Sequence, residues 1–180
     1  MNPIDFLAQY YDSQSKAFKI LVAHGKQVTN KALAAAERVP ALKPDLEFIN
    51  TAAMLHDIGI FLTDSPSFGC YGKQPYICHG ILGSELLKEK GHPELALVCE
   101  RHVGVGISVE DIQRHHLPLP NRDFIPVSIE EQIICYADKF FSKNNNGQPA
   151  EKSSADIIDS LSRYGPDKVQ RFESWVQMFE

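Results

Sequence analysis

Hydrophobic residues recur along most of the chain at intervals of three and four, which is the spacing of one face of an α-helix. The first long pattern covers residues 13–38 and is predicted to begin at Asp12 or Ser13. Its inward stripe consists of Ala17, Leu21, His24, Val28, Ala32 and Ala35. Two prolines between residues 39 and 44 end this helix, because proline lacks a backbone N–H and clashes with the preceding turn.

A second helix is predicted from Asp45 to His56 or Asp57, with Gly59 as its stop. Ser128 and Glu131 have the spacing of a capping box, which marks the start of another helix. The remaining helical patterns cover residues 79–90, 93–102, 153–162 and 166–178. Ser108 and Asp111 resemble a capping box for a further short helix, although Asp replaces the usual Glu. Because strand patterns are almost absent, we predict an all-α fold in the form of a single-domain helical bundle.

Two segments have a different composition. Residues 63–78 contain two prolines and two glycines and are predicted to form a loop, which leads directly into His79 and is a candidate lid. Residues 144–149 are polar and are predicted to be a linker. We therefore divide the chain into a main domain, residues 1–143, and a C-terminal helical extension, residues 144–180, that packs on the same domain.

Composition narrows the function classes. The 180 residues carry a net charge of -5, which gives no electrostatic basis for binding a nucleic acid polymer. No signal peptide or apolar run of membrane-spanning length is apparent, so we expect no membrane association and a cytoplasmic location. The four cysteines form no CxxC pair and are predicted to be reduced thiols in the core.

Several histidines and aspartates interrupt the apolar patterns. His24 lies within the inward stripe, and the pair His56-Asp57 closes the most apolar predicted helix. Asp138 follows Ile133, Ile134 and Ala137 and has no basic residue on its own helical face. A carboxylate in such surroundings is costly unless its charge is compensated, and a metal cation would compensate all of these groups together. Any one of them alone is more simply a hydrogen-bonded core residue; the combination favours a metal site.

The pattern His24, His56-Asp57-Ile58-Gly59, Asp138 resembles the HD superfamily of metal-dependent phosphohydrolases in its HDIG form. Residues 78–87, 100–107 and 126–139 are similar to small HDIG proteins and to HD-type diadenosine tetraphosphate hydrolases. The resemblance implies an HD-type bundle in which residues 1–143 are the metal-binding catalytic domain. It also implies the metal ligands, which are His24, His56, Asp57, His79, His102 and Asp138, with Asp57 as a bridge between two sites.

Six ligands fit two divalent metal ions better than one that keeps a position open for water. Nitrogen and oxygen donors suit iron, manganese, zinc or nickel, with magnesium also considered, and similar family members often hold iron. By resemblance, catalysis depends on His56 and Asp57, and a metal-activated water cleaves a phosphoester or phosphoanhydride bond of a nucleotide or other small phosphorylated molecule.

Two alternatives use the same residues. Some HD proteins with this ligand count are mixed-valent di-iron oxygenases that cleave C–C or C–P bonds, and a non-catalytic nucleotide-binding sensor would also keep the pocket. The aromatic C-terminal pattern has the spacing of a packing face, which is expected either to pack on the bundle or to form the contact of a homodimer.

Many family members carry Lys or Arg directly after the HDIG run, whereas this chain has Ile60. Phosphate binding is therefore expected from another cation. The four candidates are Arg101, Lys73, Lys26 and Lys139, of which Arg101 is preferred because a planar guanidinium binds phosphate well. His115 and His116 are expected at the surface.

Overall fold

The protein is described here by a computed structural model that covers residues 1–143 and 151–180. Its helices are α1 (Pro3–Leu7), α2 (Lys16–Ala36), α3 (Leu46–Leu55), α4 (His79–Glu89), α5 (Pro93–Arg101), α6 (Val109–His115), α7 (Ile129–Asp138), α8 (Ser154–Ser162) and α9 (Pro166–Phe179). The strands β1 (Asp64–Ser65) and β2 (Cys70–Tyr71) form one small antiparallel hairpin. The prediction of an all-α, single-domain fold is confirmed.

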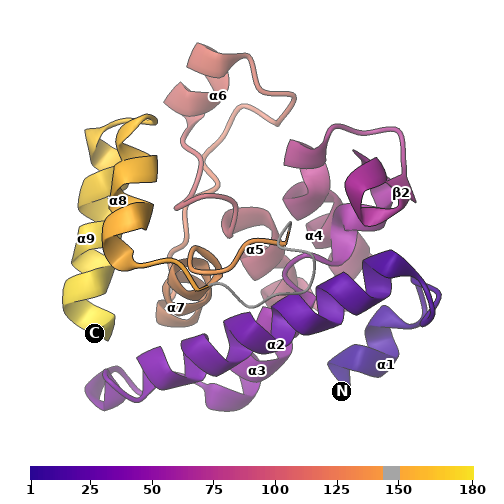
Figure 1. Ribbon diagram of the computed structural model, residues 1–180, viewed down its shortest axis with the longest axis horizontal. Coiled ribbons are helices and arrows are strands. Elements are labelled where there is room, and N and C mark those ends of the chain that lie inside the picture. Colours follow the sequence, from indigo (N-terminus) through magenta and orange to yellow (C-terminus); the bar gives the residue numbers. More distant parts are fainter. Residues whose placement is uncertain (144–150) are drawn as a thin grey trace.

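The long helix α2 runs along one side of the molecule with α3 packed beside it, and α7 and α5 lie above them (Figure 1). Helices α4 and α5 pack against each other, and α8 and α9 lie side by side at the opposite end from the hairpin. Helices α2, α3 and α7 each contribute fully buried apolar side chains to one core, among them Val28, Leu55 and Ile133. Burial of these side chains holds together the helices that carry the polar groups described below.

Helix α9 packs on α7 through aromatic residues, and α8 packs on α9. The Tyr136 ring stacks on the Phe172 ring with centroids 5.6 Å apart, and the Trp175 Nε1–H donates to Gln132 Oε1 at 3.1 Å. The Arg171 guanidinium also donates to the Val105 carbonyl oxygen at 2.9 Å. Helix α9 therefore contacts both α7 and the segment that follows α5.

Two predicted helix boundaries are wrong. Helix α2 begins at Lys16 rather than near residue 13, because Ser15 Oγ accepts from the Phe18 N–H and caps the helix. Gly59 does not stop α3, which ends at Leu55; it lies in the 3-10 turn Ile58–Leu62. A Cβ at Gly59 would lie 2.2 Å from the His79 carbonyl oxygen, so this glycine permits close contact with α4.

Only half of the predicted capping box at Ser128 forms. Ser128 Oγ accepts from the Glu131 N–H at 3.1 Å, as predicted. The Glu131 carboxylate, however, accepts from the Val127 N–H at 2.8 Å and from Arg101 rather than from Ser128. The box at Ser108 and Asp111 forms completely. The predicted linker at residues 144–149 lies outside the described residues. Among the residues that are described, no helix is long and apolar enough to span a membrane.

Candidate metal centre

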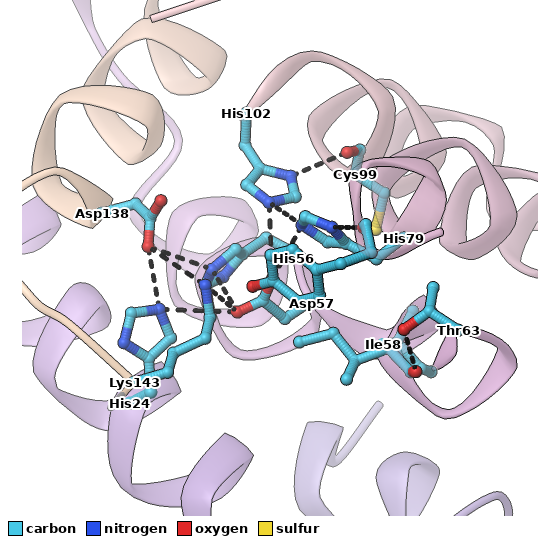
Figure 2. Close-up of polar contacts among 12 residues, drawn as sticks. His24, His56, Asp57, Ile58, Thr63, His79, Cys99, His102, Asp138 and Lys143 are labelled. Atoms are coloured by element: carbon cyan, nitrogen blue, oxygen red, sulfur yellow. Dashed lines mark hydrogen bonds and ion pairs between the residues drawn. The ribbon is translucent and has the colours of Figure 1, made fainter. Parts of the chain in front are cut away.

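The six predicted metal ligands meet at one point in the middle of the bundle (Figure 2). His24 lies halfway along α2, His56 and Asp57 follow the last residue of α3, and Asp138 ends α7. His79 is the first residue of α4, and His102 directly follows α5. Their side chains are almost inaccessible to solvent except that of Asp138, which is 13% exposed.

Three of the imidazoles are oriented by the end of a helical turn. The Nδ1–H groups of His56, His79 and His102 each donate to the carbonyl oxygen three residues earlier, at 2.7 Å in every case. The carbonyls of Ala53 and Cys99 lie in the last turns of α3 and α5, where few backbone N–H groups are available to them. The Tyr76 carbonyl lies instead in the 3-10 turn that precedes α4, and it also accepts from the His79 backbone N–H. A carbonyl oxygen only accepts hydrogen bonds, so the Nδ1 of each ring must carry the proton. In the neutral rings the Nε2 lone pairs therefore face the centre, as required of metal ligands.

Asp57 lies between two pairs of histidines. Its Oδ2 is 3.1 Å from His56 Nε2 and 3.5 Å from His24 Nε2. Its Oδ1 is 3.3 Å from His79 Nε2 and 3.4 Å from His102 Nε2. One carboxylate thus presents a separate oxygen to each pair.

Asp138 completes only one of the two halves of the centre. Its Oδ1 lies 2.8 Å from His24 Nε2 and 3.5 Å from His56 Nε2. No contact of this kind joins Asp138 to His79 or His102 among the described residues. The centre therefore has two halves, which Asp57 joins. One half contains His24, His56 and Asp138, and the other contains His79 and His102.

Several buried atoms of the centre form no well-aligned hydrogen bond within the described part of the chain. These atoms are His24 Nδ1, His56 Nε2, Asp57 Oδ1 and Asp57 Oδ2. Buried polar groups without partners are costly and rare in folded proteins. Donor atoms of His24, His56 and Asp138 lie within 4.8 Å of one another, as do those of His56, Asp57 and His102. The residues therefore fit a divalent metal, which would supply a partner to His56 Nε2 and to Asp57 Oδ1. Asp57 Oδ2 already forms an ion pair with Lys143, and His24 Nδ1 lies on the side of its ring opposite the Nε2 that faces Asp138.

The pKa values of the centre reflect burial opposed by opposite charges. Burial disfavours ionised Asp57 and Asp138, but the cationic groups of His56 and Lys143 respectively outweigh it, and both carboxyl pKa values fall well below their usual range. Burial also opposes charge on His56, yet Asp57 and Asp138 raise its pKa to about 10. Burial, reinforced by His56 and His79, lowers the pKa of His102 to about 4 and keeps this ring neutral.

Lys143 is the residue of the centre that the sequence analysis missed. Its Nζ lies 2.8 Å from Asp57 Oδ2 and 4.0 Å from Asp138 Oδ1, and its side chain is 12% exposed. Burial disfavours its charge, but these two carboxylates raise its pKa above the ordinary lysine value. Position 143 follows the end of α7, beyond the reach of helical spacing rules. The only available signal was a lysine shortly after Phe140 and Phe141.

Within the described parts of the chain, none of the four basic residues predicted to bind phosphate forms a hydrogen bond or ion pair with the six ligands. Arg101 donates to both oxygens of Glu131, at 3.1 and 2.9 Å. Lys26 lines a pocket beside the N-terminus, and Lys73 is exposed after β2. Lys139 is half-buried and faces a separate cavity described below.

Segment 63–78, the candidate lid, contacts the centre through Tyr76. The Tyr76 ring stacks on the His79 ring with centroids 4.6 Å apart, and it remains 37% exposed. Burial raises the pKa of Tyr76 to about 12, so its hydroxyl stays protonated at neutral pH. Tyr76 therefore forms a wall between His79 and the solvent.

Comparison with known proteins places these residues in a family. The HD domain family matches residues 21–163, which include all six ligands and cross the predicted boundary at residue 143. An uncharacterized protein of Methanocaldococcus jannaschii is 37% identical over 107 residues, which are 59% of this chain and 56% of that protein. A tRNA (cytidine(56)-2'-O)-methyltransferase of Picrophilus torridus is 33% identical over 124 residues, which are 68% of this chain and 32% of the enzyme. The chain thus spans about half or a third of the length of these relatives.

The fold is shared with a solved structure. The HD domain of the phosphodiesterase PgpH of L. monocytogenes aligns with a TM-score of 0.55 at 14% identity, covering 97% of this chain and 94% of that domain. The family match, the shared fold and the six converging side chains agree, and the chain belongs to the HD superfamily of metal-dependent phosphohydrolase-type proteins.

Proposed function

We propose that this protein is a metal-dependent phosphohydrolase that cleaves a phosphoester or phosphoanhydride bond of a nucleotide or other small phosphorylated molecule. One observation carries the proposal: Asp57 presents one oxygen to His24 and His56 and the other to His79 and His102. A carboxylate in this position suits two metal ions a few ångströms apart, the arrangement used for in-line attack on phosphorus.

The donor set supports a choice of metals. Imidazole nitrogen and carboxylate oxygen, without thiolate, suit iron, manganese, zinc or nickel. The four cysteines of the chain are buried elsewhere and unpaired, and none belongs to either ligand cluster. We propose two ions, with iron as the first candidate.

When bound, such metals make a water molecule nucleophilic near neutral pH and stabilise negative charge that develops on phosphate oxygens. The chain's own contribution is positional. The carbonyls of Ala53, Tyr76 and Cys99 hold the three imidazoles in one tautomer and one orientation. Burial of the ligands excludes bulk water from the centre, which strengthens each charge interaction within it.

Lys143 is the residue best placed to bind the phosphate. Its ammonium lies at the Asp57 carboxylate, and Tyr76 and Lys143 border a common pocket with a volume of about 430 Å³. Ile60, at the place where many relatives carry a cation, is buried with 1% exposure. We propose that Lys143 supplies from after α7 the positive charge that the HDIG turn lacks.

The proposed partner is a small phosphorylated molecule rather than a nucleic acid polymer or a membrane. A cytoplasmic location and a homodimer stay predictions. The direct test is elemental analysis of the purified protein, followed by a phosphate-release screen with nucleotides, sugar phosphates and glycerol phosphate in the presence of the identified metal. Metal-dependent release is expected. Oxygen uptake by the iron-loaded protein without phosphate release would instead support the di-iron oxygenase.

A further inference from the structure

A second cavity lies beside the metal centre and is formed by described residues only. Its volume is about 340 Å³, within the range of about 300–1,000 Å³ typical of small-molecule sites. It lies between α6 and the C-terminal pair α8 and α9, which Figure 1 shows on adjacent sides of the molecule. The Asp111–Lys168 ion pair joins α6 to α9 and fixes this wall.

The cavity begins one residue away from two metal ligands. Val103 follows His102 and Lys139 follows Asp138, and both Val103 and Lys139 line the cavity. None of the six ligands lines the cavity, so a molecule held here would lie against the residues that follow His102 and Asp138 without occupying the centre. The metal centre and this cavity could therefore each bind a different part of one ligand.

The two lysines that line the cavity differ in whether a carboxylate neutralises them. Lys168 is neutralised by Asp111 and by Asp167, the latter at 2.8 Å. Lys139 is half-buried and has no carboxylate within ion-pair distance in the described parts of the chain. Asp138 acts on this ammonium only from beyond ion-pair distance. A half-buried ammonium that forms no ion pair is stabilised by an anion, and this cavity is the space it faces.

The rest of the lining is apolar and aromatic. Val103, Ile107 and Leu161 contribute aliphatic surface. His115, at the end of α6, and Tyr164, just after α8, add two rings, and Tyr164 is 60% exposed although it borders the cavity. Exposed rings at a cavity mouth provide stacking surfaces for a planar aromatic group.

We propose that this cavity binds the base and a non-reacting phosphate of a nucleotide, with Tyr164 as the stacking ring and Lys139 as the anion-binding group. The inference rests on the proposed function, because the same nucleotide places its scissile phosphate at the metal centre. It narrows the substrate class from phosphorylated small molecules to nucleoside phosphates with at least two phosphate groups.

The test is isothermal titration calorimetry of the metal-loaded protein with adenosine 5′-(α,β-methylene)diphosphate, whose P–C–P link resists hydrolysis. Tyr164→Ala and Lys139→Gln are each expected to weaken binding by roughly tenfold or more. Tyr71→Ala and Lys90→Gln are matched controls, since Tyr71 and Lys90 do not line the cavity, and both are expected to bind like the unmodified protein. Circular dichroism and metal analysis show whether each variant is folded and loaded.

A kinetic comparison separates this inference from the proposed function. With a nucleotide substrate, Tyr164→Ala should raise KM with little change in kcat, while hydrolysis of glycerol phosphate, which has no base, should be unchanged. Two results would overturn the inference and leave the proposed function standing. One is equal nucleotide affinity in the unmodified protein and both cavity variants. The other is hydrolysis of glycerol phosphate by a protein that binds no nucleotide. Nucleotide binding that depends on Tyr164 and Lys139, without phosphate release from any substrate, keeps the cavity site and rejects the hydrolase.

Discussion

The Nε2 atoms of His79 and His102 lie 3.0 Å apart, although the Nδ1–H of each ring is already donated to a backbone carbonyl. In the neutral rings two lone pairs thus face each other beside Asp57 Oδ1, which lies 3.3 and 3.4 Å away. Three electron-rich atoms at such distances repel one another unless a cation lies between them. This pair of histidines is therefore the strongest local indication of a second metal position.

Removal of either histidine should empty that position alone. His79→Ala and His102→Ala are each expected to lose one metal ion per chain and to keep the other, because the cluster of His24, His56 and Asp138 contains neither residue. Inductively coupled plasma mass spectrometry measures the content, with His92→Ala as the control outside the centre. Full metal content in both variants would reject the two-metal arrangement.

Asp57 should be required for both positions. Asp57→Ala removes the oxygen that faces each histidine pair, so we expect loss of both metal ions and of phosphate release. The same metal analysis applies, together with a thermal melt to show that the variant is folded. Retention of one tightly bound ion would mean that Asp57 does not bridge.

Lys143 should act in opposite directions on metal binding and catalysis. In the metal-free protein its ammonium compensates Asp57, so Lys143→Met should lower the free energy of unfolding by about 3 kcal/mol. Metal should bind more tightly to this variant, because no ammonium has to be displaced, while phosphate release falls. Chemical denaturation and metal titration measure both effects.

Lys90→Met is the matched control, because Lys90 is exposed at the end of α4. It should behave like the unmodified protein in both measurements. Weaker metal binding in Lys143→Met would contradict the competition between the ammonium and the metal.

Gly80 should control the orientation of His102 from a neighbouring helix. A Cβ at position 80 would lie 2.6 Å from the Cys99 carbonyl oxygen, which accepts the His102 Nδ1–H. Gly80→Ala is therefore expected to displace this carbonyl and weaken metal binding by about tenfold, the lower end for loss of a group that orients a metal ligand. Gly91→Ala is the control: its φ of 80° makes alanine strained, but nothing lies within 4 Å of the added Cβ. Equal metal affinity in the two variants would show that the carbonyl does not act on His102.

Metal binding should release protons and strengthen as the pH rises. Burial opposes charge on His56, but its carboxylate neighbours prevail and raise its pKa to about 10, so the metal-free ring is protonated between pH 6 and pH 9. A metal needs the lone pair, so it competes with this proton. The expected slope is about tenfold in affinity per pH unit for one proton, levelling off above the pKa.

Calorimetry in buffers of different ionisation enthalpy counts the protons released. The metal-binding enthalpy should vary linearly with the ionisation enthalpy of the buffer. The same enthalpy in every buffer would show that the ring is already neutral.

The sequence was sufficient for the features that depend on local pattern. The helices carrying His24 and Asp138 follow from apolar spacing, and the convergence of the six side chains was expected from the HDIG resemblance. Contacts between distant segments were not accessible in this way. Arg101 is preferred for phosphate on the chemistry of its guanidinium alone, whereas its contact with Glu131, 30 residues later, appears only in the structure. Lys143 escapes prediction because it lies beyond the end of its helix.

Gly59 was interpreted as a helix stop because glycine has that role locally. Its actual role, close contact with the backbone of α4, depends on which helix packs against the turn. A pattern within one segment therefore predicts the element, but does not predict which distant group its residues will meet.

The burial of Ile60 has a consequence for engineering this protein. Restoring the familiar cation by Ile60→Lys would bring an ammonium into the hydrophobic interior, at a position with 1% exposure, rather than to the substrate. Such a graft should cost stability without improving turnover. In this chain, changes of phosphate specificity should be sought at Lys143, which follows α7 and lies outside the HDIG turn.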